Sequence, residues 1–107
     1  MSAEYIVKRE KITRAPIHPG IIFAEEVMPE LRKSRTIGEI AALLKVSRSI
    51  LYRVMAGDVA VSPDMAVRLG QLCGDDPNLW LNLQAAFDAW EASRRLSKEI
   101  RGIPTLR

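Results

Sequence analysis

With 107 residues, the chain is long enough for one small domain with a modest core. It has one cysteine, Cys73, and one histidine, His18, so it can form no intrachain disulfide and offers no cysteine or histidine set for a metal ion. Its carboxylates are scattered, with no nucleophile–base pair, and we therefore expect neither an enzyme nor a cofactor. No long apolar run suggests a membrane span, and the N-terminus lacks the apolar core of a secretion signal, so a cytoplasmic protein is expected.

The formal net charge is only +3, but the charge is distributed in blocks. Residues 32–53 carry a net charge of +5, and residues 54–92 carry −5. Lysine and arginine neutralise phosphates and release their counterions, so the basic block favours a polyanion as partner. The alternative is a charged face that contacts only solvent. Aliphatic residues are abundant and no alternating strand pattern occurs, so the expected fold is all-α.

The chain begins with a weakly patterned segment and a helix. Residues 1–16 are basic and have one apolar cluster, Tyr5-Ile6-Val7, which predicts a flexible segment that could become ordered on a partner. His18-Pro19-Gly20 predicts a turn that starts the first helix, because proline suits the first helical turn. Pro29 is expected to end that helix. With no second ligand available, His18 is expected to have a structural role.

The segment from Thr36 to Gly57 predicts two short helices joined by a tight turn. Thr36 and Glu39 can form a capping box at the first helix, and the turn falls near Lys45-Val46. Ser47 can cap the second helix, and Gly57 can end it in the left-handed conformation. This arrangement is the helix-turn-helix pattern. The residues that should face inward from the second helix are Leu51, Val54 and Met55.

The other side of this second helix is the candidate reading surface. In a helix-turn-helix its first turn points at base edges in the major groove, where arginine binds guanine bidentately. The N–H groups and positive dipole end of a helix N-terminus attract phosphates. A single module binds weakly, so a two-fold dimer is expected. The residues predicted to read bases are Arg48, Ser49, Tyr52 and Arg53, and those predicted to contact phosphates are Arg35, Thr36 and Ser47.

Two more helices are predicted. Ser62-Pro63-Asp64 starts one that Gly74 stops, and Asp76-Pro77 starts a last helix that runs to about Arg95. This last helix has an apolar stripe, which predicts either self-association or packing against the first helices. The stripe residues, which we take as candidate dimerisation residues, are Trp80, Leu83, Phe87 and Trp90.

The chain therefore divides into three parts. Residues 17–95 form the expected domain for DNA binding and dimerisation, between the flexible segment at residues 1–16 and a basic tail at residues 96–107. Gly102 and Pro104 argue against a continued helix in the tail.

The last helix also resembles a known family. Residues 76–90, DPNLWLNLQAAFDAW, are closely similar to the signature of HigA-type antitoxins, which belong to the Xre-like helix-turn-helix regulators. His18-Pro19-Gly20 resembles the opening motif of that family. The segments VSRS at residues 46–49 and SPDMAVRL at residues 62–69 resemble its middle.

The resemblance implies a five-helix, lambda-repressor-like domain that dimerises and binds a palindromic operator in its own promoter. It also implies a partner toxin, usually a small basic RelE-like ribonuclease that cleaves messenger RNA, which the antitoxin neutralises by complex formation. Such a protein would be associated with the bacterial nucleoid when bound to DNA. By the family's pattern, the base-reading positions are the four given above, and phosphate contacts fall near Thr36 and Ser47.

Four positions depart from this pattern. Lys45 replaces the usual turn glycine and is strained if its φ is positive. Ile50 is apolar where a polar residue is common, and Ala56 and Asp58 stand where an asparagine and a basic residue often contact phosphate. Ala56 and Asp58 support one alternative, an antitoxin that binds protein but has weakened DNA binding. A second alternative is a stand-alone regulator without a toxin.

Overall fold

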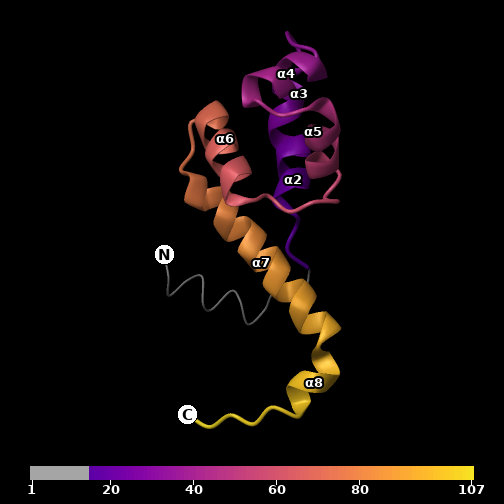
Figure 1. The fold of residues 1–107 in the computed structure, drawn as a ribbon, viewed down its shortest axis with the longest axis vertical. Coiled ribbons are helices and arrows are strands. Elements are labelled where there is room, and N and C mark those ends of the chain that lie inside the picture. Colours follow the sequence, from indigo (N-terminus) through magenta and orange to yellow (C-terminus); the bar gives the residue numbers. More distant parts are fainter. Residues whose placement is uncertain (1–14) are drawn as a thin grey trace.

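The computed structural model describes residues 15–107, which form helices joined by short loops, with no strand in that range (Figure 1). The all-α prediction is confirmed. Nearly all of the segment predicted for residues 1–16 lies outside the described residues. The elements are α2 (Pro19–Ile22), the π-helical turn η1 (Phe23–Val27), α3 (Met28–Leu31), α4 (Ile37–Leu44), α5 (Arg48–Met55), α6 (Pro63–Cys73), α7 (Pro77–Arg95) and α8 (Ser97–Arg101).

The first helix continues through Pro29, so the prediction that this proline ends the helix is wrong. Elements α2, η1 and α3 follow one another without a gap up to Leu31. In a regular α-helix the proline ring would clash with the carbonyl group of Glu25, four residues earlier. The wider π-helical turn removes that conflict. In it the N–H of Met28 donates to the carbonyl oxygen of Phe23, five residues earlier, and not to the residue four earlier as in a regular α-helix.

His18 caps this first helix and contacts the last one. Its Nδ1 accepts a hydrogen bond from the N–H of Gly20 at 2.9 Å, and Pro19 takes the first helical position as predicted. The imidazole is buried, and its ring meets the ring of Phe87 edge to face at 5.1 Å between centroids. The structure thus gives His18 a structural position, at the junction of α2 and α7.

Acidification is expected to destabilise the protein through His18. Burial lowers the pKa of His18 below its ordinary value of 6.5, against the smaller opposite effects of a backbone hydrogen bond with Val59 and the charge of Asp88. The unfolded chain therefore binds more protons than the folded chain once the pH falls below about 6.5, and the free energy of unfolding decreases there. Chemical denaturation between pH 7.5 and pH 5.5 measures the loss. His18→Asn keeps a capping side chain without a titrating ring, so its stability should depend less on pH over this interval.

The predicted caps and turn of the helix-turn-helix are present. Thr36 Oγ1 accepts from the N–H of Glu39 at 3.1 Å, and Glu39 Oε1 accepts from the N–H of Thr36 at 2.8 Å. Ser47 Oγ accepts from the N–H of Ile50 at 3.1 Å. Lys45, which stands where the resembling family usually has a glycine, has a φ of 62° and is left-handed, so it carries the cost that a Cβ incurs there.

The apolar stripe on α7 packs mainly inside its own protomer. Trp80 is 3% exposed and meets Phe23 edge to face at 6.2 Å, so it lies in the core and is not available for a dimer contact. Leu83 also packs against the core, and Phe87 packs on His18. Trp90 is half-buried under the guanidinium of Arg94, 4.8 Å from its ring. Of the two predictions for the stripe, packing against the first helices fits Trp80, Leu83 and Phe87.

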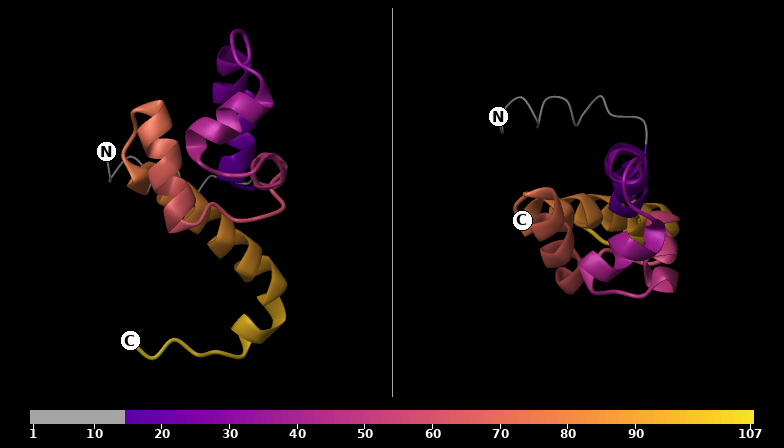
Figure 2. Two further views of the ribbon diagram at one scale, coloured as in Figure 1. Left: turned by 45° about the horizontal axis from the view of Figure 1, so that its top comes forward. Right: turned by 90° about the horizontal axis from the view of Figure 1, so that it is seen from above.

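The C-terminal half of α7 extends beyond the other helices, and α8 follows it after a bend (Figures 1 and 2). The basic tail begins with a short helix, Ser97–Arg101, and this helix ends at Gly102, one of the two residues that argue against a continued helix. None of the α8 residues is buried. The large apolar side chains exposed in this part of the chain are Leu96, Ile100, Ile103 and Leu106.

Candidate nucleic-acid interface

Helix α5 separates its buried and exposed sides as the sequence predicted. Leu51 and Val54 are buried in the core, while the four predicted base-reading residues are exposed. These four lie at positions i, i+1, i+4 and i+5, which share one side of a helix. The structure therefore brings Arg48, Ser49, Tyr52 and Arg53 together on one exposed side of α5.

Predicted phosphate contacts lie at the N-terminus of α4, where backbone N–H groups are free to meet an anion. The capping box uses the N–H groups of Thr36 and Glu39, which leaves those of Ile37 and Gly38 to face outward, since the first four N–H groups of a helix have no partner within it. Thr36 is exposed and so is Arg35 beside it. The positive end of the helix dipole and the Arg35 charge both favour an anion at this place.

Arg48 connects the two helices. A methyl group placed on Gly38 would lie 3.4 Å from Cδ and 3.9 Å from Nη1 of Arg48, and 3.9 Å from Oγ1 of Thr36. The Arg48 side chain thus leaves the start of α5 and lies over the first turn of α4. One guanidinium is thereby placed within reach of both the reading side of α5 and the predicted phosphate site.

The charge of this surface favours DNA except at one end. Helix α5 contains two arginines and no acidic residue, and Ser47, exposed at its start, keeps its hydroxyl proton for donation because its oxygen accepts from Ile50. Beyond the C-terminal end of α5, Ala56 and Asp58 are exposed. Asp58 would repel a phosphate there, so the favourable charge is concentrated at the N-terminal half of α5.

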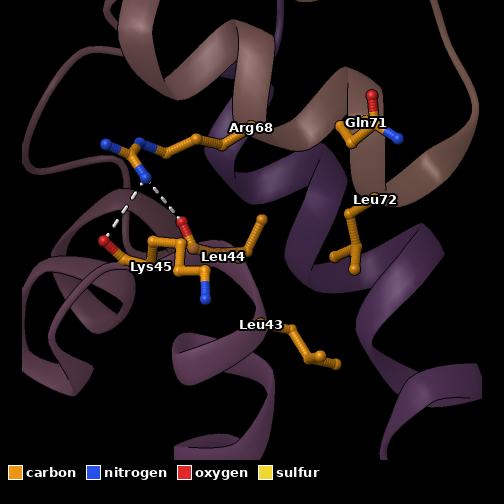
Figure 3. Close-up of a pocket in the computed structure, with 6 residues that line it drawn as sticks. All are labelled: Leu43, Leu44, Lys45, Arg68, Gln71 and Leu72. Atoms are coloured by element: carbon orange, nitrogen blue, oxygen red, sulfur yellow. Dashed lines mark hydrogen bonds between the residues drawn. The ribbon is translucent and has the colours of Figure 1, made fainter.

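Two residues whose hydrogen bonds join the helices around this surface were not found from the sequence. Arg68 on α6 donates to the carbonyl oxygens of Leu44 and Lys45 at the end of α4 (Figure 3). Gln84 on α7 is buried, and its Oε1 accepts from the N–H of Val61 at 2.7 Å, which ties the loop after α5 to α7. A signal existed for Arg68, because it is the single basic residue in the acidic block of residues 54–92.

Among residues 15–107, no group of three histidine, cysteine or acidic side chains could hold a metal ion. No helix in the same part of the chain has the length and apolar character needed to span a bilayer.

We compared the sequence and the structure of this chain with those of known proteins. No family model matches the sequence. The chain is 33% identical over 99 residues to the uncharacterised helix-turn-helix-type transcriptional regulator YbaQ of Escherichia coli, covering 91% of this chain and 86% of that protein. The solved structure of an addiction module antidote protein of the HigA family from Coxiella burnetii is 31% identical, with a TM-score of 0.76, over 88% of this chain and all of that one. The chain belongs to the HigA family of helix-turn-helix antitoxins.

A third relative carries DNA. The structure of the Pseudomonas aeruginosa antitoxin HigA with the higBA promoter is 31% identical to this HigA-family chain, with a TM-score of 0.78, over 86% of this chain and 99% of that one. The two chains therefore share both the helix-turn-helix and the helices that support it.

Proposed function

We propose that this HigA-family protein is the antitoxin of a type II toxin–antitoxin module. It binds an operator in its own promoter as a dimer and represses its own gene. It also neutralises a RelE-like, mRNA-cleaving toxin by forming a complex with it. In this role the protein works in the bacterial cytoplasm, at the nucleoid when it is bound to DNA, and catalyses no reaction itself.

The observation that carries the DNA-binding part is the reading side of α5. Four exposed polar and basic residues share this side, and the exposed N-terminus of α4 lies next to Arg48. The similarity to the HigA structure with the higBA promoter supports the same use of this surface here. The exposed apolar residues in and around α8, which are Leu96, Ile100, Ile103 and Leu106, support a dimer, because they are not covered within the protomer.

Two measurements test the proposal. The full chain should bind a duplex of its own promoter about a thousandfold or more tighter than a shuffled duplex of equal length at the same salt concentration. Co-expression with the product of the adjacent reading frame should yield a stable complex and restore growth that this product alone arrests. Promoter binding without such a complex would favour the stand-alone regulator. A complex without promoter binding would favour an antitoxin that acts through protein binding alone.

A further inference from the structure

Arg68 reaches from α6 to the end of α4 and binds two carbonyl groups there. Its Nη1 donates to the oxygen of Leu44 at 2.9 Å and to that of Lys45 at 3.3 Å, across 24 and 23 residues of the sequence. In Figure 3 the guanidinium lies above both oxygens, while the amine of Lys45 points away from it. The last carbonyl groups of a helix have no partner within it, so Arg68 supplies from α6 the donor that α4 lacks.

Lys45, whose carbonyl oxygen Arg68 binds, is also in a strained backbone conformation. Among residues 15–107, Lys45 is the one non-glycine residue with a positive φ. A side chain with a Cβ is disfavoured in this conformation, so other turn geometries compete unless a contact fixes the left-handed one. Because Ser47 begins the cap of α5 two residues later, the conformation of Lys45 sets the direction in which the chain enters α5.

We propose that Arg68 is a positioning residue for operator binding, which fixes α5 relative to α4 by holding the turn at Leu44 and Lys45. The inference rests on the proposed DNA-binding function. The base-reading side of α5 and the phosphate site at Thr36 must contact one duplex at the same time, so the angle between α4 and α5 decides whether both can bind. Arg68 acts on that angle through the backbone of the turn and needs no contact with DNA itself.

Three variants test this role. Arg68→Ala removes both hydrogen bonds, and Arg68→Lys keeps a positive donor of different shape. Gln71→Ala is the matched control, because Gln71 lies on the same helix and lines the same open pocket between α4 and α6. At a temperature where circular dichroism shows each variant folded, Arg68→Ala should bind the promoter duplex about tenfold more weakly. Arg68→Lys should lie between it and the parent, and Gln71→Ala should match the parent.

Combining Arg68→Ala with Lys45→Gly shows whether Arg68 acts by positioning the turn or only by stabilising the fold. Glycine adopts the left-handed conformation without the Cβ penalty, so Lys45→Gly should let the turn form without the Arg68 anchor. The loss of affinity caused by Arg68→Ala should therefore be several-fold smaller in the Lys45→Gly background than in the parent. An equal loss in both backgrounds would overturn the proposal, as would unchanged promoter binding by Arg68→Ala.

Amide hydrogen exchange tests the anchor without DNA. The N–H of Lys45 donates to the oxygen of Ala42 at 3.1 Å, and that of Val46 donates to the oxygen of Ala41 at 3.0 Å. Both amides should exchange faster in Arg68→Ala than in the parent or in Gln71→Ala. If the parent protein failed to bind its promoter, the proposed function would fall, and the exchange rates would still decide whether Arg68 holds the turn. Unchanged exchange rates of these two amides in Arg68→Ala would overturn the proposal that Arg68 holds the turn.

Discussion

Arg48→Ala is expected to weaken binding to the promoter duplex by about tenfold or more, since one bidentate arginine–guanine contact is worth about 1–3 kcal/mol. The side chain is exposed at the start of α5 and lies over Gly38 at the predicted phosphate site, so its loss removes a predicted contact on the reading side and leaves the core intact. In a two-fold complex the substitution removes the Arg48 contact from both half-sites. Titration of a labelled duplex by fluorescence anisotropy measures the change, and circular dichroism checks the fold.

A control and a salt series sharpen this result. Arg107→Ala removes the same charge from an exposed position at the end of the chain, and its affinity should stay close to that of the parent. If Arg48 reads a base, its loss should depend on the duplex sequence. If it contacts only phosphate, the loss should be uniform, and the slope of log affinity against log salt should fall by about one. Equal affinities of Arg48→Ala and the parent would remove Arg48 from the interface.

The sequence was most informative where structure depends on residues close together in the chain. The capping box of Thr36 and Glu39 and the cap of Ser47 each join residues three apart, so their spacing alone identifies them. The strain at Lys45 was stated as a condition, because the resembling family usually has a glycine at this turn position, and its φ of 62° meets that condition. The exposed side of α5 followed from helical periodicity once the caps had fixed the ends of the helix.

The sequence was less informative where the structure depends on a contact between residues far apart in the chain, or on a local change that compensates for a residue such as proline. Pro29 is an end signal in isolation, but a π-helical turn before it lets the helix continue. The periodicity of the stripe on α7 identified an apolar side without saying what covers it, and the T-shaped contact with Phe23 places Trp80 in the core. Arg68 acts across more than twenty residues, so spacing along the chain could not connect it to the turn.

Gly20→Ala is expected to have the largest effect on stability, a loss of about 3 kcal/mol or more in the free energy of unfolding. A methyl group on Gly20 would overlap the carbonyl oxygen of Val54 and lie 2.7 Å from its carbonyl carbon. Both are backbone atoms of α5, so no rotation of a side chain can relieve the overlap, and α2 and α5 must separate. Urea denaturation followed by circular dichroism measures the loss, which is a large share of the roughly 5–15 kcal/mol that stabilises a typical domain.

Gly38→Ala is the matched control, because the nearest heavy atom to its added methyl group is Cδ of Arg48 at 3.4 Å, an ordinary contact with a flexible side chain. Its stability should equal or slightly exceed that of the parent, since alanine favours the helix over glycine by up to about 1 kcal/mol. Equal stability of Gly20→Ala and Gly38→Ala would mean that α2 and α5 are not in backbone contact. If the contact is as described, any Gly20→Ala protein that stays folded should also bind its promoter more weakly. Its α5 must move away from α2, and the reading side of α5 moves with it.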